Sequence, residues 1–464
     1  MAFLIGGANT LDDSYTIDNS LRFSDTNYLT RDNTTQSGGG TNFTFSAWLK
    51  MSTYDDGGYQ GILSIFKDSN DYFEIYKDNS EKLQIGQNIN GTSVYYQNQD
   101  FVYRDYSAWY HLVVSFNNSA SGEINKIKTY VNGQEISADE KVTNSNPFGD
   151  VGLGDSAYDT RVGSYRDNTD PTWNGYMADV HLIAGQTLAA SYFGETNDNG
   201  VWVPKEYTGT FGDNGFFLEF KQTGTSQNSS GMGADTSGED NHLAVTGLSS
   251  IDVTVDTPTN NFCTWNPLIG RAAAYATFAE GNLDADFTSG SVYWRATGSI
   301  GVTSGKWYAE IKCIDDGGNT DLKIGVEHAS PDQTTIDGVH KVIQSWNGYK
   351  ASGGSAASFG DSYADGDIVG VLLDMDNGTI KFSKNGTMMA SSASAYTDLI
   401  SAMPDSGWAF FAYGYDNANV QANFGNAPFS ISSGNADANG YGNFEYAVPS
   451  GYYALCTKNL AEYG

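Results

Sequence analysis

Basic residues are scarce in this chain of 464 residues, with 24 Lys and Arg against 55 Asp and Glu, a formal net charge of −31. Phosphate contacts require clustered Lys and Arg, so we expect no nucleic-acid partner and no docking on an anionic membrane. No apolar stretch approaches the roughly 18 residues of a membrane helix, so we expect no membrane insertion. The first seven residues lack a basic region, which predicts no secretory signal.

Cysteine and histidine are also rare, with three Cys and five His. No CxxC pair is present, so neither a zinc site nor a disulfide framework is expected, and Cys263, Cys313 and Cys456 are predicted to be reduced, partly buried thiols. The absence of HExxH, GxSxG and phosphate-loop patterns gives no support to metal-dependent, nucleophilic or nucleotide chemistry. We therefore expect no cofactor.

Glycine is abundant (54 residues) and aromatic residues reach 14%, whereas Leu- and Ala-rich stretches with a helical period are almost absent. Two alternating segments, residues 126–136 and 379–389, each run through an Asn-Gly pair, Asn132-Gly133 and Asn385-Gly386. Asn-Gly accepts the positive φ angles of a type I′ turn and is the strongest short hairpin signal. The sequence therefore predicts an all-β protein with two separate antiparallel β-sandwich domains.

Composition and strand patterns divide the chain further. Residues 20–23 and 215–220 are predicted to pair and close the ends of the first domain, and residues 188–193 to form a short helix. A segment rich in Gly, Ser, Thr and Asn reads as a linker or extended strap, in which residues 251–255 can add an edge strand. The predicted parts are an N-terminal segment (1–14), a first sandwich (15–222), the strap (223–259), a second sandwich (260–429) and a C-terminal tail (430–464).

Four stretches of the first sandwich match a known pattern, residues 43–50, 107–111, 128–133 and 173–180. Through them this sandwich resembles the laminin-G-like branch of the concanavalin A-like jelly rolls. The second sandwich resembles the SPRY domain, most specifically through residues 366–374 and 384–386, with residues 304–308 and 423–425 in support. Trp48, Trp109, Trp173 and Trp307 lie within these stretches and are predicted to be core or supporting residues.

Four connecting segments resemble parts of structural proteins of tailed bacteriophages, marine ones especially. They are residues 193–195, 200–205, 256–262 and 449–457. The resemblance implies a virion protein, such as a tail fibre or related appendage, that is assembled in the host cytoplasm and released by lysis. It also implies a homotrimer that contacts other virion proteins.

Glycosidases of the jelly-roll superfamily need two carboxylates projecting from one strand face. No such alternating pair is found, and Glu74 and Glu310 read as lone residues on exposed strand faces. We therefore expect the chain to have no enzymatic activity. The resemblance leaves calcium open, with Asp55-Asp56, residues 167–170 and Asp315-Asp316 as candidate loops, but none matches a complete ligand set and no ligand is assigned.

Loop aromatics are the better candidates for partner contact, and Tyr54 and Tyr59 are the predicted binding residues, since an exposed Tyr stacks on a sugar or anchors an interface. The predicted function is adhesion to a host-surface glycan or protein. The alternatives are capsid decoration or the bridging of virion parts, and glycan depolymerisation.

Overall fold

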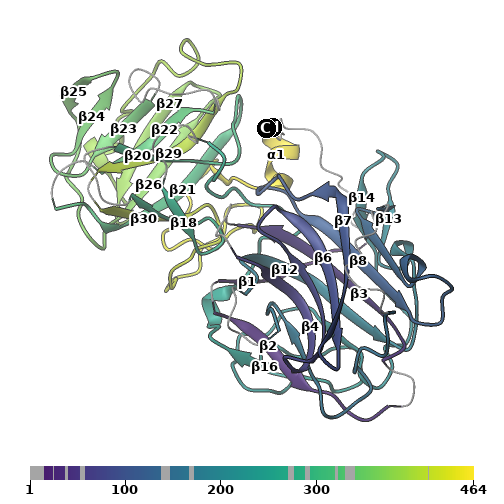
Figure 1. Ribbon diagram of the computed structural model, residues 1–464. Coiled ribbons are helices and arrows are strands. Elements are labelled where there is room, and N and C mark those ends of the chain that lie inside the picture. Colours follow the sequence, from purple (N-terminus) through teal and green to yellow (C-terminus); the bar gives the residue numbers. More distant parts are fainter. Residues whose placement is uncertain are drawn as a thin grey trace. The chain divides into compact units, whose positions relative to one another are not determined.

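The computed structural model describes residues 15–24, 26–36, 40–52, 58–136, 147–166, 172–269, 276–287, 293–318, 322–329, 340–415 and 417–464. The chain divides into two compact units, Asp12–Thr259 (the N-terminal unit) and Asn260–Gly464 (the C-terminal unit). Each unit is built on two large β-sheets, and all but one of the strand pairings between described residues are antiparallel (Figure 1). The predicted all-β architecture of two antiparallel sandwiches is confirmed.

Two large sheets form the N-terminal unit, here named the β3 sheet and the β5 sheet. In the described residues the β3 sheet has the order β10 (Gln134–Glu135), β9 (Ile127–Val131), β8 (Tyr110–Asn117), β3 (Asn42–Met51), β12 (Gly175–Ala184), β1 (Ser20–Phe23) and β17 (Val253–Thr254), and β15 (Phe216–Leu218) also pairs with β12. The β5 sheet has the order β16 (Ala244–Thr246), β2 (Tyr28–Asp32), β11 (Asp159–Val162), β4 (Gln60–Asp68), β5 (Asp71–Lys77), β6 (Lys82–Ile89) and β7 (Thr92–Val102).

The core of the N-terminal unit follows from strand alternation, which sends every second side chain to one face. Phe43 on β3 lies 5.5 Å from Phe116 on β8 and 5.3 Å from Phe73 on β5, measured between ring centroids. All three rings are fully buried, and each contributes about 1.5–3 kcal/mol by leaving water. The β3 and β5 sheets are therefore held together by aromatic packing.

Residues 20–23 and 215–220 were predicted to pair with each other. In the structure both segments pair with strand β12. Strand β1 pairs with the first part of β12, with Leu21 opposite Met177, and β15 pairs with the later part, with Phe217 opposite His181. Between these stretches Asp179 has a φ of 52°, and the register against β3 shifts. The predicted pairing of residues 20–23 with 215–220 is wrong, because this β-bulge gives each segment its own stretch of β12.

Residues 223–259 add a strand to the edge of each large sheet of the N-terminal unit. Strand β16 pairs with β2, and β17 pairs with β1 after the 3-10 turn η3 (Ser250–Asp252). The edge strand predicted in residues 251–255 is confirmed in the shorter form of β17. Just beyond it, the Asp256 carboxylate forms a buried ion pair of 2.7 Å with Lys50 on β3.

The C-terminal unit also has two large sheets, named the β21 sheet and the β22 sheet. In the described residues the β21 sheet has the order β18 (Thr277–Ala279), β19 (Asp284–Phe287), β30 (Ala418–Asn423), β21 (Lys306–Asp315), β26 (Ile368–Asp374), β27 (Thr379–Lys384) and β28 (Thr387–Met388), and β31 (Tyr453–Ala454) pairs in parallel with β21. The β22 sheet has the order β20 (Tyr293–Thr297), β29 (Trp408–Tyr415), β22 (Lys323–His328), β23 (His340–Gln344), β24 (Tyr349–Ser352) and β25 (Ser355–Ser358). Their shared core contains Trp265, Trp307, Phe382, Phe410 and Phe424.

Both predicted Asn-Gly hairpins are confirmed. Asn132 and Gly133 have φ angles of 48° and 76°, and they join β9 to β10. Asn385 and Gly386 have nearly the same angles, 47° and 75°, and they join β27 to β28. Positive φ at both central positions is the type I′ geometry that suits the twist of paired strands.

Helical structure is sparse in the described residues. It consists of α1 (Thr457–Tyr463) and the 3-10 turns η1 (Glu123–Asn125), η2 (Ala190–Tyr192), η3 and η4 (Met389–Ser392). The helix predicted over residues 188–193 is the single 3-10 turn η2. In the described part of the chain, no helix has the length and apolar character needed to cross a membrane.

The tail after residue 429 packs on the C-terminal unit through Glu310 of β21. The Glu310 carboxylate accepts hydrogen bonds from the backbone N–H groups of Glu445 and Tyr446, at 2.9 and 2.8 Å, and from the side chains of Tyr308 and Asn423. Glu310 is fully buried, so its predicted position on an exposed face is wrong. The outer face of this strand is covered by the tail.

The predicted tryptophans and cysteines are buried as expected. Trp48, Trp109, Trp173 and Trp307 are each at most 9% exposed, and the three cysteines are buried free thiols.

Candidate functional site

Of the two predicted binding tyrosines, Tyr59 lies among the described residues and Tyr54 lies outside them. The Tyr59 side chain is 41% exposed, and its ring stacks on Tyr165 at 5.7 Å and meets the edge of Tyr76 at 5.5 Å. Tyr59 therefore rests on its own domain with part of its ring open to solvent, and its role in binding stays a prediction.

Glu74 lies on β5, and the prediction that it is exposed is wrong. The carboxylate is fully buried, and Oε2 lies 3.9 Å from Nε of Arg166. The Arg166 guanidinium also lies over the ring of Tyr72, 4.8 Å from its centroid. Arg166 thus supplies the positive charge that accompanies the buried carboxylate.

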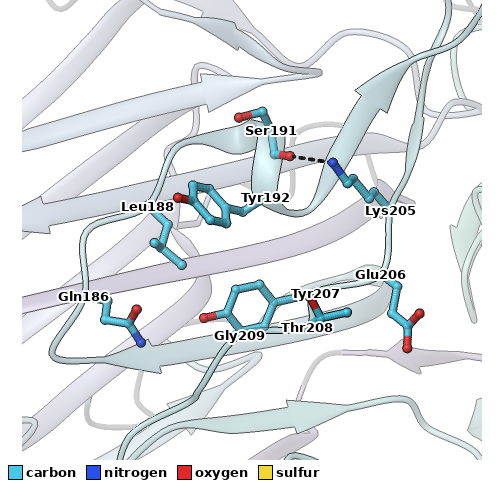
Figure 2. A pocket seen from close by; sticks show the side chains of 9 residues that line it. All are labelled: Gln186, Leu188, Ser191, Tyr192, Lys205, Glu206, Tyr207, Thr208 and Gly209. Atoms are coloured by element: carbon cyan, nitrogen blue, oxygen red, sulfur yellow. Dashed lines mark hydrogen bonds between the residues drawn. The ribbon is translucent and has the colours of Figure 1, made fainter.

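An open pocket of about 550 Å³ lies in the N-terminal unit, on segments that follow β12 and β14 (Trp202–Pro204) (Figure 2). Figure 2 shows the rings of Tyr192 and Tyr207 reaching toward the same side of the pocket from these two segments. The lining residues are Gln186, Leu188, Ser191, Tyr192, Lys205, Glu206, Tyr207, Thr208 and Gly209. We call this the Tyr192–Tyr207 pocket.

A small hairpin of β13 (Gly194–Thr196) and β14 positions one side of the pocket. Trp202 on β14 donates a hydrogen bond from Nε1 to Nδ1 of His111 on β8, at 3.0 Å. The other ring nitrogen of His111 therefore carries the proton and donates to Oγ of Ser46, at 2.9 Å. Burial lowers the pKa of His111 to about 3, so the imidazole stays neutral and the hairpin is fixed to the β3 sheet.

Contacts with two aromatic rings hold the ring of Tyr207 in place. It stacks on Phe193 at 5.0 Å, and the edge of Phe211 approaches it at 5.2 Å. The Tyr207 hydroxyl donates to the carbonyl oxygen of Thr210 at 3.0 Å. Burial raises the pKa of Tyr207, so the phenol stays protonated at neutral pH. Tyr192, by contrast, lines the pocket with a side chain that is 52% exposed.

The charged groups of the pocket largely cancel. Nζ of Lys205 lies 3.6 Å from a carboxylate oxygen of Glu195 and donates a long hydrogen bond of 3.5 Å to the carbonyl of Ser191, which Figure 2 draws as a dashed line. Glu206 follows Lys205 directly and is exposed. Lys205, Glu195 and Glu206 together therefore carry a net charge of about −1 at neutral pH.

This lining offers aromatic rings and polar groups that can contact a ligand. Glycoside hydrolysis uses a pair of carboxylates about 5–10 Å apart, on either side of the scissile bond. Glu206 is the single carboxylate among the described residues that line the pocket, and no His, Cys or Asp accompanies it there. The tyrosine rings, the amide of Gln186 and the hydroxyl of Ser191 offer stacking and hydrogen bonding instead.

One of the candidate calcium loops gains a third carboxylate in the structure. Oxygen atoms of Asp315, Asp316 and Asp365 lie within 4.8 Å of one another in the C-terminal unit. Each carboxylate also accepts a backbone N–H, for example from Gly317 to Asp315 at 2.8 Å. These bonds are typical of polar turns, and we assign no metal ligand. Asp55-Asp56 and residues 167–170 lie outside the described residues.

The Tyr192–Tyr207 pocket was missed from the sequence. Its two tyrosines meet the criterion used there, exposed aromatics in loops, but they are 15 positions apart in segments without strand patterning. The signal that could have marked them is the local density of aromatic residues between 192 and 217, of which Phe193, Trp202, Tyr207, Phe211 and Phe217 belong to one packed cluster.

Comparison with known proteins identifies both domains. Residues 23–191 match the family described as the concanavalin A-like lectin/glucanases superfamily, of the laminin G type, and residues 306–426 match the SPRY domain. The chain therefore contains a laminin G-like domain followed by a SPRY domain, as the resemblances imply.

Among curated relatives, Ran-binding protein 9 of Danio rerio is 28% identical over 139 residues, which cover 29% of this chain and 22% of that protein. Ran-binding protein 9 of Xenopus laevis is 25% identical over 194 residues, covering 39% of this chain and 33% of that protein. The chain thus spans a third or less of the length of these relatives.

Two solved structures match parts of the chain at low identity and low TM-score. The SPRY domain of human HERC1 is 20% identical, with a TM-score of 0.25, and the match covers 30% of this chain and 87% of that one. The native heptameric SAP-like pentraxin from Limulus polyphemus is 15% identical, with a TM-score of 0.27, covering 37% of this chain and 78% of that one.

Proposed function

We propose that the chain is a non-catalytic attachment protein that binds a host-surface glycan or protein. The observation that carries the proposal is the Tyr192–Tyr207 pocket, an open site with aromatic walls on a rigid β-scaffold. Ligand sites in proteins combine apolar or aromatic walls with a few polar groups that fix orientation, and loops on rigid sheets are their usual location.

The state of the buried carboxylates supports binding over catalysis. Glu310 accepts four hydrogen bonds from the tail and its neighbours, Asp256 is paired with Lys50, and Glu74 lies beside Arg166. These carboxylates are engaged in holding the fold. A depolymerase would need a carboxylate pair beside an open cleft, which the lining of the pocket does not offer.

The setting we propose is a tail fibre or related appendage of a tailed bacteriophage, as a homotrimer assembled in the host cytoplasm, released by lysis and attached to other virion proteins. This part rests on the resemblance of residues 193–195, 200–205, 256–262 and 449–457 to phage structural proteins. Many copies on one particle convert weak single contacts into strong attachment, because later contacts form at high effective concentration.

The test uses the purified full chain in a glycan array and in a binding assay with bacterial cells. The proposal predicts retention on at least one surface, and a correctly folded multimer that binds neither would refute it. Light scattering measures the oligomeric state. Antibody labelling of intact particles separates the settings, since a distal tail position supports attachment and a position in the capsid lattice supports decoration.

A further inference from the structure

We infer that the Tyr192–Tyr207 pocket binds an uncharged hexose residue of a surface glycan and discriminates against acidic sugars. The inference rests on the proposed function and adds to it the location of the site and the class of sugar. Three features of the pocket carry it, namely its preformed aromatic walls, its mixed polar groups and its charge.

The aromatic walls are preformed on one side and accessible on the other. Tyr207 is fixed by stacking on Phe193 and by the hydrogen bond of its hydroxyl to Thr210, so binding does not have to immobilise it. Tyr192 is about half exposed, so a ligand that covers it removes aromatic surface from water. Tyrosine gives a large contact area for little conformational entropy, which suits the C–H face of a pyranose ring.

The polar groups around the walls match the hydroxyls of a sugar. Ser191 and Lys205 are donors at the pocket, and the Gln186 amide oxygen and the Glu206 carboxylate are acceptors. A sugar hydroxyl both donates and accepts, so it can pair with either kind of group. The Gln186 side chain is itself oriented by a hydrogen bond of 2.8 Å from Nε2 to the carbonyl of Thr210, which leaves its amide oxygen free of that contact.

The charges argue against an acidic ligand. Lys205 is the cation of the pocket, and Glu195 lies 3.6 Å from its ammonium group. Glu206 then leaves the site with an excess of negative charge, in a chain whose net charge is −31. A carboxylate, sulfate or phosphate on the ligand would meet repulsion here, whereas a neutral ring would not.

The pocket also has a suitable size. Its volume of about 550 Å³ falls within the range of roughly 300–1,000 Å³ that is usual for small-molecule sites. A site of this size holds part of a glycan. The remaining sugars of the glycan stay in solvent on the open side of the pocket.

The experiment compares the full chain with single variants on an array that carries neutral glycans beside sialylated, uronic acid-containing and sulfated ones. Tyr192→Ala removes the exposed wall and is expected to weaken binding of neutral glycans about tenfold or more. Tyr192→Phe keeps the ring and should retain binding. Tyr349→Ala, which removes a similarly exposed tyrosine from the C-terminal unit, is the matched control and should leave binding unchanged.

Charge reversal gives a second readout that loss of folding cannot imitate. Glu206→Lys turns the local excess of negative charge into a positive one and is expected to raise the response to acidic glycans relative to neutral ones. Glycan binding that is unaffected by Tyr192→Ala, or a preference of the unmodified chain for acidic glycans, would overturn the inference and leave the proposed function standing. A chain that binds neither glycans nor cells overturns both.

Discussion

Lys50 and Asp256, separated by 206 positions in the sequence, form an ion pair of 2.7 Å in the interior of the N-terminal unit. Both side chains are at most 1% exposed, and Asp256 also accepts a hydrogen bond of 3.1 Å from Nε1 of Trp109. The pair ties the segment after β17 to the centre of the β3 sheet.

Asp256→Ala leaves the Lys50 ammonium group buried without its partner. We expect it to lower the free energy of unfolding of the N-terminal unit by about 3–5 kcal/mol, the usual cost of breaking a buried pair. Urea denaturation of the full chain measures the effect. Glu135→Ala, which removes the exposed pair of Lys128 and Glu135, is the control and should cost at most about 1 kcal/mol. Equal effects of the two changes would contradict the interpretation.

Two features of the structure require glycine at position 133, namely the positive φ of its backbone and the proximity of the Trp202 ring. Its φ is 76°, and a Cβ at this position would lie 2.4 Å from the ring of Trp202. Gly133→Ala should therefore destabilise the chain by more than the roughly 1–2 kcal/mol of a left-handed residue alone. Gly185 has a φ of 81°, and a Cβ added there would meet open space. Gly185→Ala therefore measures the energetic cost of the left-handed backbone by itself. Thermal unfolding should give a larger loss for Gly133→Ala than for Gly185→Ala.

Asp179 gives the N-terminal unit a pH dependence of defined sign. Burial raises its pKa to about 7, although a hydrogen bond of 2.8 Å from the Tyr15 hydroxyl opposes the shift. The raised pKa contributes stability that is fully present below the unfolded value of about 4 and is lost as the pH rises through about 7. The contribution of Asp179 to the free energy of unfolding should therefore fall over this interval, whereas the contributions of the buried His111 and His181 rise.

Asp179→Asn removes this titration and keeps an acceptor for Tyr15, and Asn tolerates the φ of 52° at this position. We expect the variant to be more stable than the unmodified chain at pH 8, by an amount on the order of a few kcal/mol, and about equally stable at pH 4. Urea denaturation across this pH range checks the difference. His111 and His181, whose pKa values burial lowers to about 3, are present in both proteins, so the readout is the difference between the two proteins and not the trend of either one. A constant difference at all pH values would contradict the prediction.

Glu310 holds the tail through the backbone N–H groups of Glu445 and Tyr446. Glu310→Ala removes the shared acceptor, and hydrogen bonds to a charged group contribute about 1.5–3 kcal/mol each. Hydrogen exchange at these two amides should become at least about tenfold faster. Glu462→Ala, an exposed change in α1, is the control and should leave these amides protected. Unchanged protection in Glu310→Ala would mean that other contacts hold this part of the tail.

The sequence predicts the parts of this fold that are determined locally. The turns at Asn132-Gly133 and Asn385-Gly386 depend on the φ preferences of two residues, and alternation alone places Phe43 and Phe116 in the core. The choice of partner strand is not local, which is why β1 and β15 were wrongly paired with each other. The bulge at Asp179, which lets β12 receive both, has no signature in the pattern of apolar residues.

The alternation of residues along a strand predicts to which face a side chain points. It does not predict whether another segment of the chain covers that face. Glu74 and Glu310 were predicted on exposed faces, yet both are buried, because Arg166 lies beside one and the tail residues 445–446 cover the other. The Tyr192–Tyr207 pocket escaped prediction for the same reason, since its shape depends on how two irregular segments pack on the β3 sheet.

We propose that the chain retains a glycan without altering it. The most direct measurement is mass spectrometry of a neutral oligosaccharide that has been captured by the immobilised full chain, held for several hours and then released. We expect the chain to retain the oligosaccharide and to release it with its mass unchanged. Shortened products, or a failure of the folded chain to retain any glycan of the array, would contradict it.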